Sequence, residues 1–107
     1  MHTVDPKAVF CRRLKEAREA AGLSQKQLGI AAGLDEFVAS TRINRYEVGK
    51  HEPDAGMVGR LAEALRVPLA YLYAEDDRLA RMILLFSGLG VRQQEVLMRE
   101  LDRRRPV

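Results

Sequence analysis

The sequence predicts an all-α fold in which five short helices form a small domain and a C-terminal helical hairpin follows them. Apolar residues recur at spacings of three and four along most of the chain, and no segment alternates as a half-buried strand does. Glycine, proline, serine and aspartate interrupt this pattern at intervals that suit short helices. The 107 residues, of which 47% are hydrophobic, suffice for one small domain with an appendage.

A first helix is predicted near the N-terminus by four apolar residues that share one face. Phe10, Leu14, Ala17 and Ala21 recur at helical spacing, while charged residues cover the rest of the surface. Gly22 should end this helix, because glycine adopts the left-handed conformation of a helix C-terminus at little cost.

The second and third helices are bounded by a cap and by glycines. Ser24 and Gln27 stand three apart and match a capping box, so Ser24 should open the second helix. Gly33 should end it. A third helix is expected to end at Gly49.

Two further helices complete the predicted N-terminal domain, residues 1–75. Beyond Pro53 and Asp54, the fourth helix carries an apolar set: Met57, Val58, Leu61, Ala62 and Leu65. Pro68 suits the first position of a brief fifth helix that contains Leu69 and Leu72.

The apolar pattern of residues 76–107 predicts a helical hairpin. The two helices have more apolar surface than they can bury against each other alone. Such a hairpin either docks on the preceding domain or meets the same surface of a second molecule, and the second arrangement is common after a complete small domain. We therefore expect a homodimer. The predicted dimerisation residues are Leu79, Met82, Ile83, Phe86, Leu97 and Leu101.

Composition restricts the classes of function. The net charge of +3 and the pI near 9.4 favour an anionic partner only mildly. The single cysteine, Cys11, excludes an internal disulfide framework and suits a reducing compartment, where we expect it to be a small buried hydrophobic residue. The chain has neither a signal-peptide core nor an apolar run of membrane-spanning length, so we expect no membrane partner and a cytoplasmic location.

Catalysis and metal binding are not expected. The two histidines are His2, near the N-terminus, and His51, beside a lysine, and no Cys/His spacing suits a metal site. No nucleophile and base form a recognisable pair. The sequence therefore predicts a protein that is not an enzyme and that needs no metal or cofactor.

The segments LSQKQLGIAAGL and INRYEVGKHEPD together resemble the phage-repressor (Cro-type, xenobiotic-response-element-like) helix-turn-helix family, over residues 7–75. The resemblance implies a five-helix repressor-like domain that binds double-stranded DNA. Leu28, Ala32, Leu34 and Ile43 then hold the two helices of the motif together, and the ring of Tyr46 packs on the core. The family usually has alanine at the position of Gly29, where the helices pass closely; glycine should cost about 1 kcal/mol of helix propensity relative to alanine.

The same resemblance assigns DNA contacts to polar residues, with a helix around residues 40–48 in the major groove. Arginine can donate two hydrogen bonds to guanine, asparagine can pair with adenine, and a threonine methyl can meet the methyl of thymine. The residues expected to contact bases are Ser40, Thr41, Asn44 and Arg45. Those expected to contact phosphates are Gln25, Arg42, Lys50 and His51.

The stretch DEFVASTR, between the two helices of the motif, is about four residues longer than the family pattern. Either the third helix begins early, capped by Asp35, or the turn is enlarged and Phe37 and Val38 fold back onto Ile30. We favour the enlarged turn, with Ser40 near the N-cap.

Taken together, these features predict a sequence-specific double-stranded DNA-binding transcriptional regulator that acts as a homodimeric repressor. An alternative is an antitoxin that neutralises a toxin protein and represses the operon it shares with it. A purely structural helical adaptor is a third option, but it would not need arginines on the third helix.

Overall fold

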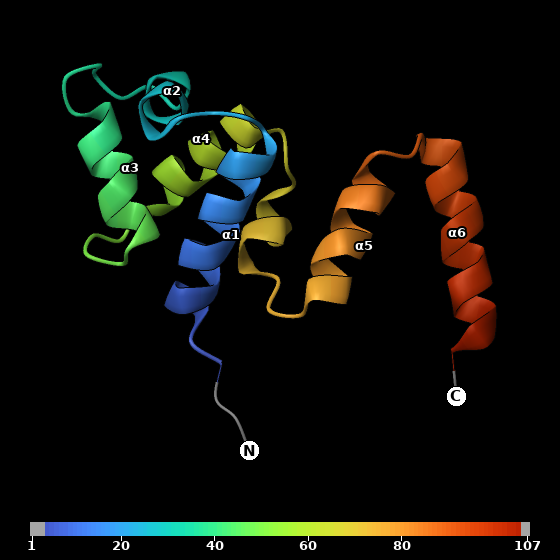
Figure 1. The fold of residues 1–107 in the computed structure, drawn as a ribbon. Coiled ribbons are helices and arrows are strands. Elements are labelled where there is room, and N and C mark those ends of the chain that lie inside the picture. The colour runs from blue at the N-terminus through green and yellow to red at the C-terminus, as the bar shows by residue number, and fades with distance from the viewer. Residues whose placement is uncertain (1–3, 106–107) are drawn as a thin grey trace.

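The computed structural model describes residues 4–105 of the chain, and every regular element in this range is helical. His2 lies outside the described residues. Figure 1 shows the elements in order. They are α1 (Pro6–Ala20), α2 (Gln25–Ala31), α3 (Ala39–Glu47), α4 (Ala55–Leu65), the 3₁₀ helix η1 (Leu69–Tyr73), α5 (Asp77–Ser87) and α6 (Val91–Arg104). The expected all-α class is confirmed.

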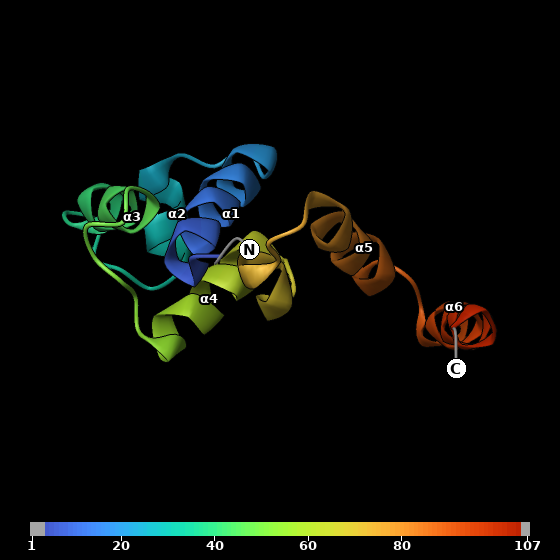
Figure 2. The same ribbon diagram turned by 90° about the horizontal axis from the view of Figure 1, so that it is seen from below.

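The molecule consists of a compact N-terminal part and an extended C-terminal arm. The helices from α1 to η1 pack together, whereas α5 and α6 lead progressively away from them in both views (Figures 1 and 2). The extents are 52 × 37 × 22 Å and the radius of gyration is 15.8 Å. A compact chain of about 100 residues has a radius of gyration near 13 Å, so this molecule is elongated.

The core draws one fully buried side chain from each of the first five helices. These are Leu14, Leu28, Ile43, Leu61 and Leu72. Because these side chains meet in one cluster, the helices from α1 to η1 share a single core. The apolar positions that the periodicity predicts for these helices are therefore largely correct.

The predicted helix boundaries are also largely correct. Ser24 and Gln27 form both bonds of the capping box, and Gly22 and Gly49 adopt positive φ values of 71° and 79°. Ala21 is an exception: it was expected on the buried face of α1 but is exposed. It is the C-cap residue, where the backbone already turns away from the core.

The contact between α2 and α3 reverses the expected effect of Gly29. A Cβ atom at Gly29 would lie 2.6 Å from the Cβ of Ala39 and 2.9 Å from its Cα, which is closer than real Cβ contacts allow. Ala39 is fully buried at this crossing. Glycine is thus required sterically, and its propensity cost is offset because alanine would force the two helices apart.

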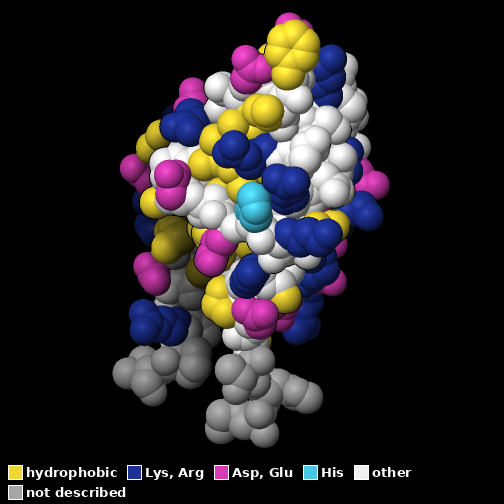
Figure 3. Space-filling view, turned by 90° about the vertical axis from the view of Figure 1, so that its left-hand side faces the viewer, with side chains coloured by type: hydrophobic (Ala, Val, Ile, Leu, Met, Phe, Trp, Pro, Cys, Tyr) yellow, Lys and Arg dark blue, Asp and Glu magenta, His cyan; other side chains and the backbone are white. Residues whose placement is uncertain are grey.

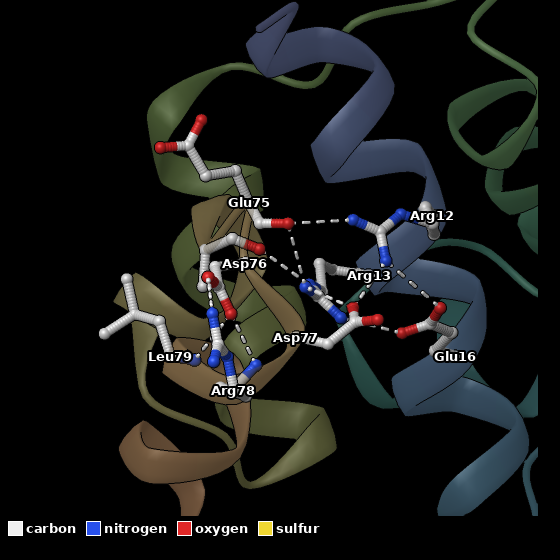
Figure 4. A network of polar contacts seen from close by, with 9 residues as sticks. Arg12, Arg13, Glu16, Glu75, Asp76, Asp77, Arg78 and Leu79 are labelled. Atoms are coloured by element: carbon white, nitrogen blue, oxygen red, sulfur yellow. Dashed lines mark hydrogen bonds and ion pairs between the residues drawn. The ribbon is translucent and has the colours of Figure 1, made fainter.

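A buried arginine joins the arm to the domain, as Figure 4 shows. Arg13 is only 3% exposed, and its Nε donates to the carbonyl oxygen of Ala74 at 2.7 Å. Nη2 of Arg13 and Nη1 of Arg12 both donate to Oδ1 of Asp77, at 3.0 and 2.9 Å. These two guanidinium groups hold the pKa of Asp77 below its usual range. The start of α5 is therefore fixed to α1.

Beyond this junction the arm is increasingly exposed. Ala80 of α5 is buried and Ile83 packs against the core, but α6 has no buried residue. The expected alternative, in which the hairpin packs as a whole on its own domain, does not describe this structure. No helix in residues 4–105 has both the length and the apolar character needed to cross a bilayer.

An apolar groove of about 530 Å³ lies between the two helices of the arm. Five of the six expected dimerisation residues line it together; the sixth, Leu79, is half exposed and lies outside the lining. The five are Met82, Ile83, Phe86, Leu97 and Leu101.

Candidate nucleic-acid interface

Helix α3 presents two distinct faces. Ala39, Ile43 and Tyr46 are buried against the domain, at the spacings of one helix face. The opposite face is exposed to solvent. It carries the four residues expected to contact bases: Ser40, Thr41, Asn44 and Arg45.

The turn before α3 is enlarged, as predicted, but it differs in detail. The helix begins at Ala39, with Val38 as N-cap, so Ser40 is its second residue. Phe37 does not fold back onto Ile30: it is 86% exposed, and Ile30 and Val38 are also exposed. The reason is that Ala39 already fills the contact with α2 at Gly29.

Glu47 is turned inward from α3 and neutralised. Nε and one terminal nitrogen of Arg18 donate to its two oxygens, at 2.6 and 3.1 Å, and the other terminal nitrogen donates to the carbonyl of Leu23. The Glu47 side chain is only 4% exposed, and its hydrogen bonds raise the pKa of Arg18. The ion pair ties α1 to α3 and removes the negative charge of Glu47 from the outer face.

Gln25, at the start of α2, is engaged with α3. Its Nε2 donates to Oδ1 of Asn44 at 3.2 Å and to Oε1 of Glu47 at 3.1 Å. Both amide hydrogens are thereby used, so a phosphate oxygen could bind Gln25 only in exchange for one of them. Asn44 retains its own amide hydrogens and one oxygen lone pair for another partner.

Basic side chains surround the exposed face of α3, as Figure 3 shows in dark blue. Arg45, Lys50 and His51 are exposed, and Arg42 is half-buried. Within residues 4–105, none of these four side chains forms an internal hydrogen bond or ion pair. Their donors are thus available to a ligand.

The end of α3 is held firmly. The backbone N–H groups of Lys50 and His51 both donate to the carbonyl of Arg45, at 2.9 and 3.3 Å. The half-buried Cys11 donates from Sγ to the carbonyl of Tyr46 at 3.2 Å, and burial raises the pKa of its thiol. Cys11 is therefore a packing residue that also bonds α3, beyond the purely apolar role expected.

The comparisons with known proteins agree with this geometry. A helix-turn-helix family model matches residues 14–72, more than half of the chain. The crystal structure of the transcriptional regulator BswR superimposes with a TM-score of 0.82 at 46% sequence identity, covering 87% of this chain and 92% of that one. No curated protein matches the chain. The chain therefore belongs to the Cro/C1-type, xenobiotic-response-element-like helix-turn-helix family, and it is a non-enzymatic DNA-binding transcriptional regulator.

Proposed function

We propose that the protein is a sequence-specific repressor that binds DNA as a homodimer and inserts α3 into the major groove. The observation that carries this proposal is the outer face of α3. It offers polar and basic side chains with no internal ion pair, while Glu47 is turned inward. A face of this kind suits an anionic duplex that is read by hydrogen bonds to base edges.

Base contacts come from the exposed residues of α3. Arg45 is suited to donate two hydrogen bonds to guanine, and Asn44, oriented by Gln25, to pair with adenine. Ser40 and Thr41 lie nearer the N-terminus of α3, where recognition helices reach base edges.

Phosphate contacts surround this face. Arg42, Lys50 and His51 supply donors whose strength does not depend on base sequence. Gln25 joins them only if it releases Asn44 or Glu47, so we assign it two roles: positioning Asn44 in the free protein and contacting a phosphate in the complex.

The arm, residues 76–107, is the dimerisation element. The groove between α5 and α6 is lined almost wholly by apolar side chains, and α6 buries none of its residues within the chain. Leaving such a surface in water is unfavourable, and a second copy offers the same surface in return. A two-fold axis through the arms relates the two copies of α3, so the preferred site is an inverted repeat.

We expect repression rather than activation, because binding to a promoter is enough to repress it. A dimer that covers a promoter excludes other proteins from it and needs no further contact, whereas activation requires a dedicated surface for the transcription machinery. A reporter gene placed behind the bound site should therefore be expressed less when the protein is present.

Selection of bound sequences from a random duplex pool tests the proposal. We expect an inverted repeat with base preferences in each half-site. Binding that is equally strong for all duplexes, or a single unrepeated half-site, would refute sequence reading by a dimer.

The antitoxin alternative places a toxin protein, rather than a second copy, in the apolar groove. Purification of the chain from its own cells separates the two functions. A homodimer without companions supports the repressor, whereas a stoichiometric small protein lost on mutation of the groove supports the antitoxin.

A further inference from the structure

The enlarged turn between α2 and α3 is held by hydrogen bonds to Asp35, although it carries an exposed aromatic side chain. Oδ1 of Asp35 accepts from the N–H of Phe37 at 2.8 Å, and the carbonyl of Asp35 accepts from Val38 and Ala39 at 3.1 and 2.9 Å. The close contact of Ala39 with Gly29 fixes the end of the turn. Phe37 is thus held outward by a defined backbone.

Exposure alone assigns no role to Phe37, because single apolar residues are common on protein surfaces. Its position is more specific. Phe37 lies two residues before Ala39, the first residue of α3, and the carbonyl of Asp35 accepts from the N–H of Ala39, four residues on, as in one turn of an α-helix. Phe37 therefore lies next to the N-terminus of α3, the end that carries Ser40 and Thr41.

The side chains of the turn do not suit a phosphate contact. Residues 35–38 read Asp-Glu-Phe-Val and contain no basic side chain, and the two carboxylates repel a phosphate backbone. The apolar group that base edges present to an aromatic ring in the major groove is the C5-methyl group of thymine.

We infer that Phe37 is a specificity-determining residue that contacts a thymine methyl group in the major groove, beside the base pairs met by α3. The inference rests on the proposed function. It adds to the site an apolar contact supplied by the residues that lengthen this turn, and it predicts a thymine at a fixed position in each half-site.

Replacement of single thymines by deoxyuridine tests the inference, because this change removes only the methyl group. The probe is the duplex selected by the wild-type protein. At one position per half-site, loss of the methyl should weaken wild-type binding about fourfold, the value of one buried carbon group. Phe37→Ala should weaken binding to the thymine duplex by a similar factor and be insensitive to deoxyuridine at that position.

Two further variants sharpen the result. Phe37→Leu should retain part of the sensitivity, since leucine keeps an apolar tip. Leu69→Ala removes another exposed apolar side chain, on η1, and should bind DNA as the wild type does. Because Phe37 is 86% exposed, its replacement should leave the melting temperature unchanged.

The outcomes separate this inference from the proposed function. If Phe37→Ala keeps the full wild-type sensitivity at every thymine, or if it changes sedimentation of the free protein but not DNA affinity, Phe37 is no DNA contact. In either case selective binding by the wild-type protein would leave the wider function standing. If the wild-type protein selects no sequence at all, both fail.

Discussion

At the scale of single residues, the direction of each charged side chain on α3 decides whether its charge faces the core or the solvent. Glu47 and Arg45 are two residues apart on the helix, so they face different sides. Glu47 pairs with Arg18 inside, and Arg45 remains exposed. The donors that remain unpaired on the outer face are those we propose to contact the DNA.

Replacing Arg45 by alanine should cost about 1 to 3 kcal/mol on the preferred site and relax the preference at one base pair per half-site. The reason is the loss of a two-bond contact to a base. Binding titrations against all single-base variants of the site provide the measurement. Arg81→Ala, an exposed arginine on α5, serves as the control and should keep the preference. Unchanged selectivity in Arg45→Ala would show that another residue reads the base.

Gly29→Ala should destabilise the protein by about 1 to 3 kcal/mol, because the new Cβ would overlap Ala39 at the crossing of α2 and α3. Gly59→Ala is the matched control: it lies on α4 with open space around it, so it should stabilise the protein by up to about 1 kcal/mol. Chemical denaturation of both variants measures the difference. A Gly29→Ala protein that is as stable as the wild type, or more stable, would contradict the close contact.

At the scale of helices, local signals in the sequence determine most boundaries. The capping box at Ser24 and the glycines at 22 and 49 act within a few residues, so a linear pattern reveals them. The outward residues of α3 could also be assigned, because the aromatic at Tyr46 fixes their register.

Long-range contacts could not be predicted in the same way. Arg13 lies among the charged residues of α1 and reads as a surface position, yet it is buried because Ala74 and Asp77 come to it from more than 60 residues away. The prediction that Phe37 folds back onto Ile30 was wrong because it too depends on a contact between separate helices. The room available to the Phe37 side chain beside α2 depends on how closely Ala39 packs against Gly29.

Arg13→Ala should destabilise the domain by about 1 to 3 kcal/mol, since it leaves the carbonyl of Ala74 without its buried donor. It should also accelerate hydrogen exchange in α5, whose first residues lose an anchor. Arg12→Ala is the control, because Arg12 is exposed and its removal should have a smaller effect. Equal exchange in α5 of the wild type and Arg13→Ala would argue against this role.

At the scale of the whole molecule, the extended shape separates α3, which we propose reads DNA, from the arm, which we propose forms the dimer. The arm is anchored at its start by Asp77 and exposes an apolar groove between α5 and α6. A lone domain would contact few bases, so in the proposed dimer the second copy would raise specific affinity above the nonspecific background.

Leu101→Asp should convert the dimer to a folded monomer, because it places a charge in the groove. Leu101 is preferable to Ile83 for this purpose, since Ile83 also packs on the core. Sedimentation at micromolar concentration measures the change. Leu85→Asp, on α5 but outside the groove lining, should remain a dimer. A Leu101→Asp protein that still sediments as a dimer would place the interface elsewhere.

The most direct test of the account is the affinity of the wild-type protein for duplexes in which the two half-sites are moved apart one base pair at a time. A two-fold dimer with α3 in successive major grooves predicts a sharp maximum with half-site centres about 34 Å apart, or a multiple of this distance. Adding about five base pairs, half a helical turn, should abolish the gain over a single half-site, because it turns the second groove away. Affinity that does not depend on the spacing would contradict the claim that two copies of α3 read the site together.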